Sequence, residues 1–425
     1  MPTTMFATMI IAFALSISVA VAIGLASLVG AWQANLNFLT VVKEMFSAIN
    51  KFPLAAIPFF ILAGNLMESG GISARLVEFA KSIVGGIQGG LAATCVLTCM
   101  IFAAVSGSSV ATTFAIGAIL IPALIKHGYP TNYAAALQAT SAELGVIIPP
   151  SIPLILYGVS AEVSIGELFI AGFGPGLLIG GALMVFVIIY ARWKGYGKED
   201  HLGRLPFLQA TRKAALALMM PVIILGGIYG GIFTPTEASV VAVFYALIVG
   251  VVIYRETKIA DLPRVLRKSV VSSAVILFII ANAGLFSHLI TRAGVPDMIG
   301  AMLVEWLKSP AIFLLGVNLT LFLIGMFIET SASIIVLAPI LAPVAVHFGI
   351  DPVHFGIIMV VNLALGMITP PFGVNLFAAC TVARISIDQI VTRLVPFVLV
   401  VFGCLMIITY FPVISLGLRD WAYAK

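Results

Sequence analysis

Two clusters of small polar residues interrupt otherwise apolar stretches of this sequence, at Ser106–Ser109 and at Glu329–Ser331. Each cluster is followed further along the chain by a glycine and a proline pair, at Gly145–Ser151 and at Gly366–Pro371. Consecutive prolines remove two amide donors and stop a helix, which frees backbone carbonyls. Carbonyl and hydroxyl oxygens are the ligands that hard cations prefer. The residue types therefore predict two sites for a monovalent cation such as sodium.

We expect two or more coupling sodium ions, with no residue assigned to catalysis or to an organic cofactor. The predicted metal ligands are Ser106, Ser108, Ser109, Gly145 and Pro149 for one ion, and Thr330, Ser331, Gly366, Thr369 and Pro370 for the other. Helix amino termini at such breaks also suit a carboxylate. Candidate substrate ligands are Ser151, Glu329, Asn362 and Asn375, and Asn362 also belongs to the second ion shell. An isolated serine in such a helix commonly bonds only its own backbone, but paired clusters favour a functional reading.

The two clusters lie in an internal repeat that needs no gaps. Residues 107–151 align with residues 328–372 at a constant spacing. The matched positions are Pro122 with Pro343, Gly128 with Gly349, Gly145 with Gly366, and Pro149-Pro150 with Pro370-Pro371. Each copy predicts a re-entrant pair of half-helices with a polar tip, followed by a broken helix. Irregular backbone at membrane depth is tolerated only inside protein or along a cavity.

The composition predicts a membrane protein. Of the 425 residues, 61% are hydrophobic and 9% are charged, whereas soluble domains carry about 25% charged residues. The run Met5–Gly30 has no charge and predicts one retained first helix. We expect an all-α polytopic fold with about nine crossings and two hairpins, surrounded by membrane lipid.

Two basic connectors orient the chain, one at Arg192–Lys213 and one at Arg255–Lys268. Two apolar spans separate them, so both lie on one side, and the positive-inside rule makes that side the cytoplasm. Counting outward places the amino terminus in the cytoplasm and the carboxyl terminus, with Arg419 and Lys425, in the periplasm. On this count the two copies of the repeat are inverted, which is typical of secondary transporters whose site forms where the copies meet.

The sequence divides into six parts on this reading. Three amphipathic segments, Leu36–Lys51, Ile72–Ile87 and Pro296–Lys308, are interpreted as interfacial helices or connectors. The parts are first helices and interfacial arm (1–90), first hairpin and broken helix (91–166), scaffold helices with connectors (167–270), helix and second arm (271–309), second hairpin and broken helix (310–383), and last helix (384–425).

Three carboxylates lie in apolar surroundings, where ionisable side chains are functional candidates. Glu143 and Glu329 are each open to two roles, binding a cation or proton and structural pairing. Glu237 follows Thr234 at the capping-box spacing and is expected to cap a helix. Cys95 and Cys99 lack the partners of a zinc site and are expected to pack as small hydrophobes.

Four segments together resemble a known family. PFFILAGNLMESGGI (Pro58–Ile72), AAVSGSSVAT (Ala103–Thr112), GVIIPPS (Gly145–Ser151) and FTPTEAS (Phe233–Ser239) resemble the large membrane subunit (the DctM-like M subunit) of tripartite ATP-independent periplasmic (TRAP) transporters. The resemblance implies an elevator-type core in the bacterial inner membrane and sodium-driven import of an organic acid, either sialic acid or a C4-dicarboxylate. It also implies two partners, a small Q-type membrane subunit of about four helices and a soluble periplasmic binding protein.

Other function classes are weighed against this one. The sequence has no G-x-x-x-x-G-K-[ST] loop for an ATP-driven pump, and its histidines are too scattered for an embedded metalloenzyme. The net charge of +5 is attributed to basic residues in cytoplasmic loops and does not indicate nucleic-acid binding. A stand-alone sodium–dicarboxylate symporter of another elevator family remains the alternative. A channel is also open, since re-entrant hairpins can line pores.

Overall fold

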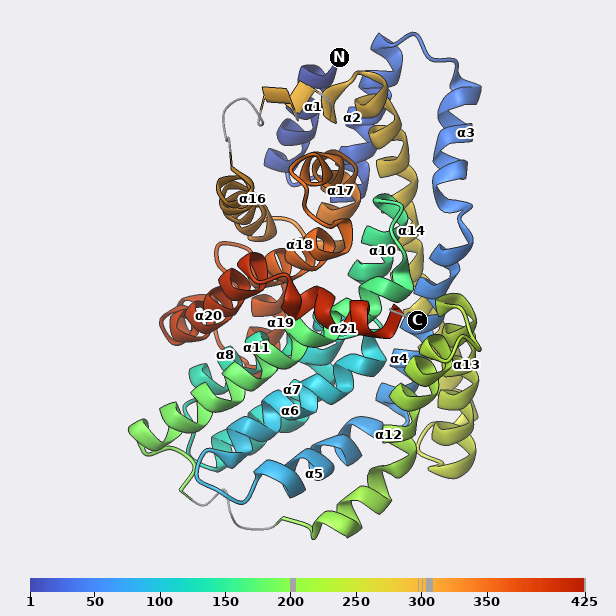
Figure 1. Cartoon of the computed structure of the whole chain (residues 1–425). Coiled ribbons are helices and arrows are strands. Elements are labelled where there is room, and N and C mark those ends of the chain that lie inside the picture. Colours follow the sequence, from blue (N-terminus) through green and yellow to red (C-terminus); the bar gives the residue numbers. More distant parts are fainter. Residues whose placement is uncertain (199–203, 297, 300, 303–308, 424–425) are drawn as a thin grey trace.

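The computed structural model describes residues 1–198, 204–296, 298–299, 301–302 and 309–423, and these residues form helices without any strand (Figure 1). Eight of the helices within these ranges are long and apolar enough to span a membrane, or nine if one bent pair counts as a span. This agrees with the expected all-α polytopic fold. His201 and Lys425, and most of the segment 296–308, lie outside the described residues.

One group of helices, called the frame here, lies along the top and right of Figure 1. Its central helix α14 packs against α2, α3 and α4, while α13 packs against α4 and α12. The frame helices are α1 (Pro2–Ala14), α2 (Val19–Gln33), α3 (Phe38–Ile49), α4 (Ala56–Ser69), α12 (Phe207–Tyr229), α13 (Pro235–Leu247) and α14 (Leu262–Arg292). Short turns η1 (Phe52–Ala55), η2 (Ile248–Ile253) and η3 (Ile259–Asp261) extend α4, α13 and α14.

The remaining helices form the repeat unit. They are α6 (Gly90–Ser106), α7 (Ser109–Lys126), α8 (Thr131–Ala142), α9 (Leu144–Ile147), α10 (Ile152–Ser160), α11 (Ile165–Lys194), α16 (Pro310–Gly325), α17 (Thr330–His347), α18 (Pro352–Met367), α19 (Val374–Ala383), α20 (Ile387–Tyr410) and α21 (Val413–Tyr423). Helix α5 (Ile72–Val84) joins the two groups by packing against α12 and α6. Of the two interpretations left open for Leu36–Lys51 and Ile72–Ile87, helix or connector, the structure has helices, α3 and α5.

The prediction of one helix over Met5–Gly30 is wrong. The chain turns back after Ala14, where Ser16 has φ 59°, and α1 packs against α2. A Cβ atom on Gly30 would lie 2.4 Å from the Met5 sulfur, so the two ends of the run touch. The position of a turn inside an unbroken apolar run cannot be predicted from composition, because the residues on both sides of the turn are equally apolar. The amino terminus was placed in the cytoplasm by counting this run as one membrane crossing. Because the run forms two helices, that placement no longer follows.

The internal repeat is present in the fold. Helices α7 and α17 begin and end at matched positions, and α8 and α18 begin at the matched residues Thr131 and Pro352. The copies interlock, because α10 of the first packs against α17, while α19 of the second packs against α7 and α8. Because each copy packs one helix against the other copy, the two copies form a single packed unit.

The hairpin limbs are longer than the half-helices that were expected. In the first hairpin, α6 has 17 residues and α7 has 18, joined at Gly107 with φ 60°. The first broken helix bends by 43° between the segments Thr131–Ile147 and Ile152–Ser160. The Pro149–Pro150 and Pro370–Pro371 peptide bonds are both cis. In the first hairpin only Gly107 and Ser108 separate α6 from α7, so nearly all of the apolar sequence on either side is helical.

Two local predictions are confirmed. The Thr234 hydroxyl accepts from the Glu237 amide at 3.3 Å, and the Glu237 carboxylate accepts from the Thr234 amide at 2.8 Å. Cys95 and Cys99 are buried free thiols that contact the Gln138 side chain. The thiols therefore pack as small side chains around one amide.

The carboxyl-terminal helix α21 is tied to the repeat unit by one arginine. The Arg419 guanidinium lies 2.8 Å from the Asp351 carboxylate and 3.8 Å from that of Glu167. Burial opposes ionisation of Asp351, but hydrogen bonds from Arg419 and from the His354 amide outweigh it and lower the pKa of Asp351. Asp351 caps the start of α18 and Glu167 lies in the first turn of α11, so Arg419 connects α21 to the starts of two helices.

We expect Arg419→Ala to lower the free energy of unfolding by about 1–2 kcal/mol, since the pair is partly exposed. A carboxyl group with a lowered native pKa stabilises the fold above its unfolded pKa of about 3.9 and loses that contribution as pH falls through the native value. The acid-side loss of stability should therefore be smaller in the variant. Thermal unfolding of the solubilised protein between pH 3 and pH 7 measures both effects. Arg292→Ala, at an exposed site, is the control, and an equal effect there would contradict the assignment.

Candidate functional site

The tip of the first hairpin meets the break of the first broken helix. The Ile152 amide donates to the Gly107 carbonyl at 3.3 Å. The Ser151 hydroxyl caps α10 by accepting from the Leu154 amide at 3.4 Å and donates to the Val146 carbonyl at 2.5 Å. A Cβ atom on Gly145 would lie 2.9 Å from the Ser108 carbonyl oxygen. Ser108, Gly145 and Ser151 are therefore brought together as predicted.

Hydroxyl groups converge on the Ser108 carbonyl. The Thr112 hydroxyl donates to it at 2.8 Å, and the Ser106 hydroxyl lies 3.3 Å from it and 2.9 Å from that of Thr112. The neighbouring Ser109 is buried, and its carbonyl accepts from Thr113. Thr112 was not among the predicted ligands. Its bond to the Ser108 carbonyl is the back-bond of a helical threonine, and the Ser106 hydroxyl adds a contact from the other limb of the hairpin.

The tip of the second hairpin is built in the same way but carries a carboxylate. Glu329 caps α17 by accepting from the Ala332 amide at 3.1 Å, and it also accepts from the Ser331 hydroxyl at 2.8 Å. The Thr330 hydroxyl contacts the Met367 sulfur at 2.8 Å, next to Gly366. The second tip and the second break are therefore in contact.

Two predicted ligands of the second site point elsewhere. The Asn362 amide donates to Asn318 of α16 at 2.7 Å, and Asn318 donates to Thr409 of α20 at 3.0 Å. Asn362 thus ties α18 to two neighbouring helices through its amide nitrogen, while its Oδ1 has no partner among the described residues, so its role as a ligand stays a prediction. The Thr369 hydroxyl donates to the Leu365 carbonyl at 2.8 Å, which is the ordinary back-bond of a helical threonine.

Asn375 is placed against Glu143, so one side chain from each copy meets the other. The Asn375 amide donates to Glu143 Oε1 at 2.5 Å, and both residues are buried. Glu143 Oε2 and Asn375 Oδ1 have no partner among the described residues. Two buried acceptor oxygens without donors, close to both breaks, fit the oxygen donor set that a sodium ion takes.

The first tip also lines a cavity of about 560 Å³ between the repeat unit and the frame. Ser106 and Ser108 face it from the tip, and Asn65, Glu68 and Lys268 face it from α4 and α14. The Lys268 ammonium lies 2.8 Å from the Glu68 carboxylate. This inner cavity lies at the end of α14 that carries the basic connector.

The comparisons with known proteins agree with this architecture. The family model of the tripartite ATP-independent periplasmic transporter, DctM component, matches residues 3–414. This chain belongs to that family. The chain is therefore a multi-pass membrane permease subunit of the TRAP type.

Several named relatives transport different acids. The chain is 44% identical to the C4-dicarboxylate TRAP transporter large permease protein DctM of Pseudomonas aeruginosa, over 89% of this chain and 88% of that one. It is 36% identical to the sialic acid TRAP transporter large permease protein SiaM of Vibrio cholerae, over 98% and 96%. It is 43% identical to the isethionate TRAP transporter permease protein DctMQ of Oleidesulfovibrio alaskensis, over 94% and 63%.

Two solved structures share the fold. The YdaH transporter of Alcanivorax borkumensis superposes with a TM-score of 0.65 at 16% identity, over 90% of this chain and 87% of that one. MtrF of Neisseria gonorrhoeae superposes with a TM-score of 0.60 at 17% identity, over 87% and 83%. At these identities the TRAP chain shares their fold alone.

Gly145→Ala tests the contact between tip and break. The added Cβ atom would lie 2.8 Å from the Thr112 hydroxyl and 2.9 Å from the Ser108 carbonyl, so the tip must shift. We expect a loss of about 1–3 kcal/mol in stability, measured by thermal unfolding. Gly181→Ala is the matched control, because nothing lies within 4 Å of its added Cβ atom. Equal behaviour of the two variants would show that the tip does not press on the break.

Asn375→Leu tests the bridge between the copies. It leaves Glu143 without its one donor, and an unsatisfied buried group costs about 1–3 kcal/mol. Glu143→Gln combined with Asn375→Leu should recover part of that loss, because the carboxyl charge is gone. A double-mutant cycle on unfolding temperature measures the coupling, and strictly additive effects would argue against a direct contact.

Proposed function

We propose that this chain is the transporting subunit of a sodium-coupled TRAP importer in the bacterial inner membrane. It takes an organic acid of the C4-dicarboxylate or sialic acid class from a periplasmic binding protein and works with a small membrane subunit. The observation that carries the proposal is the contact of each polar hairpin tip with the helix break of its own copy. The substrate classes come from the names of the relatives, and the partners come from the tripartite, periplasmic family to which the chain belongs.

Sodium would be held by oxygens that converge at the two tips. The first set is the Ser108 carbonyl with the hydroxyls of Ser106 and Thr112. The second set is the Glu329 carboxylate with the Ser331 hydroxyl. Bound sodium would supply positive charge beside the tips, where an organic anion can be attracted. The chain itself supplies the rigid breaks that fix these oxygens.

Movement of the repeat unit along the frame would carry the site across the membrane. On this proposal, the inner cavity, with the first tip on one wall and the frame on the other, would be the path that opens toward the basic connectors. Inverted repeats suit a site that opens alternately to the two sides of the membrane, because one copy would close the site on one side and the other copy on the opposite side. The carboxyl-terminal helix α21 would then lie on the periplasmic side.

Two sodium ions are sufficient as a driving force. Each ion supplies about 2.3 kcal/mol from 100 mV and about 1.4 kcal/mol from a tenfold gradient, or roughly 7 kcal/mol for two. An anionic substrate entering an inside-negative cell would take back part of this.

Reconstitution tests the proposal. The chain and its small subunit are placed in liposomes, and labelled sialic acid and succinate uptake is followed under an inward sodium gradient, with and without the cognate binding protein. Uptake that needs both sodium and the binding protein is expected. Sodium-dependent uptake without the binding protein would favour a stand-alone symporter, and downhill flux alone would favour a channel. A Hill coefficient for sodium near one would contradict two coupled ions.

A further inference from the structure

A second cavity lies at the far end of α14, in the same seam between the frame and the repeat unit. It has a volume of about 220 Å³ and is called the outer cavity here. Ser287 of α14 faces it, and Ser287 is roughly 28 Å along the helix from Lys268 of the inner cavity. The seam therefore has a cavity at each end.

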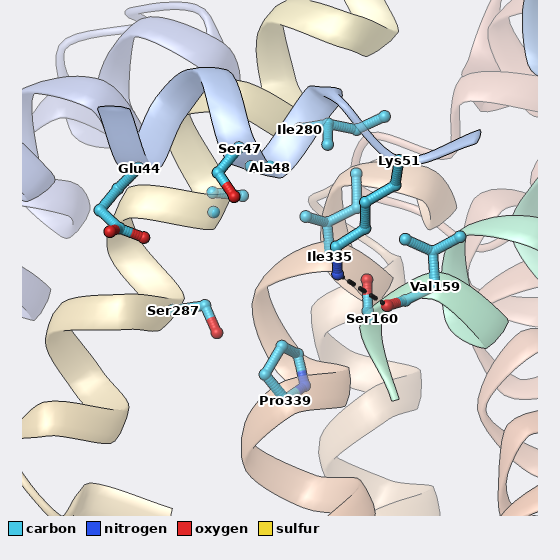
Figure 2. Close-up of a pocket in the computed structure, with 12 residues that line it drawn as sticks. Glu44, Ser47, Ala48, Lys51, Val159, Ser160, Ile280, Ser287, Ile335 and Pro339 are labelled. Atoms are coloured by element: carbon cyan, nitrogen blue, oxygen red, sulfur yellow. Dashed lines mark hydrogen bonds between the residues drawn. The ribbon is translucent and has the colours of Figure 1, made fainter. Parts of the chain in front are cut away.

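The walls of the outer cavity come from both groups of helices (Figure 2). Glu44, Ser47 and Ala48 share one face of α3 at helical spacing, and Lys51 follows the end of that helix in extended backbone. Ser160 of α10 and Pro339 of α17 face them from the repeat unit. A Cβ atom on Gly284 would lie 2.1 Å from Ala48, so α3 is packed closely against α14.

The charges in this cavity are separated. Figure 2 shows Lys51 at one end, beside Val159 and Ser160, and Glu44 at the other. The Lys51 ammonium has three donors, and it donates to the Val159 carbonyl at 3.4 Å. Glu44 lies 3.6 Å from the His288 ring. The hydroxyls of Ser47, Ser160 and Ser287 lie along the walls between these ends.

We propose that the outer cavity is an entry site for a hydroxylated monocarboxylate, an acid of the sugar-acid type, and this rests on the proposed function. The carboxylate would bind Lys51, and the neutral hydroxyl end would bind the serines and donate to Glu44. A dicarboxylate fits poorly, because its second carboxylate would approach Glu44. The volume equals that of roughly seven waters, which suits a small acid.

Binding at Lys51 would also act on the seam itself. Val159 lies in the last turn of α10, whose carbonyls carry partial negative charge. The Lys51–Val159 bond joins frame to repeat unit, so an arriving carboxylate that withdraws Lys51 would release this contact. Entry of the acid would thereby loosen one of the contacts between the frame and the repeat unit, beside the packing of α14 on α17.

Thiol protection tests the site without relying on transport. Ser47→Cys places a thiol inside the cavity, and the four native cysteines are buried. Labelling by N-ethylmaleimide is measured on the complex with its small subunit, with and without gluconate or succinate. At a gluconate concentration ten times Kd, labelling should slow about tenfold. Succinate should protect at clearly higher concentrations only.

Four further changes in the Ser47→Cys background locate the ligand. Lys51→Gln should abolish gluconate protection and Lys51→Arg should keep it. Lys43→Gln is the control, since Lys43 lies on α3, which ends two residues before Lys51, and does not line the cavity. Glu44→Gln should let succinate protect as well as gluconate does.

The inference would be overturned by protection that survives Lys51→Gln, or by succinate protecting as well as gluconate while Glu44 is present. Sodium-driven uptake in the same preparation reports the proposed function separately. Uptake without any gluconate protection overturns the entry site alone. Protection without uptake supports the site and counts against sodium-coupled import.

Discussion

The central constraint on this chain is that backbone groups released by a helix break must find partners away from water. Consecutive prolines interrupt both broken helices, and each break is placed against the tip of a hairpin. The Gly107 carbonyl accepts from Ile152 in one copy, and the Met326 carbonyl accepts from Gly373 in the other, at 3.4 Å. Because a lipid-facing break would leave such groups unpaired, the hairpins must cover the breaks. The site and the fold therefore arise from the same requirement.

Features with a local cause could be predicted from the sequence. The capping box at Thr234 and the repeat frame of α7 and α17 depend on spacing alone, and both are present. The turn inside the first apolar run could not be predicted, because Ser16 has little to distinguish it from other serines. Its cause is tertiary, namely the close packing of Met5 on Gly30.

The site was predictable only as far as each residue acts on its own segment. Ser108 and Glu329 cap helices that begin one residue later, so their positions at the tips followed from the pattern. Asn362 looked equally suitable, but its direction depends on Asn318, which lies on another helix. The hydrogen bond between Asn375 and Glu143 also joins the two copies, and the two residues do not occupy matched positions of the repeat, so the alignment did not predict it. Contacts between copies need the packing, which single-sequence periodicity does not contain.

The two copies share a fold but differ in charge. Ser108 of the first tip matches Glu329 of the second, so one cap is neutral and the other is a carboxylate. On the sodium proposal, an ion beside Glu329 is neutralised by its own ligand, whereas an ion beside Ser108 leaves a net positive charge. The organic anion should then favour the first tip, which is the tip that lines the inner cavity. The duplicated backbone thus supplies two equivalent breaks, and on the sodium proposal the one substituted cap would give them different roles.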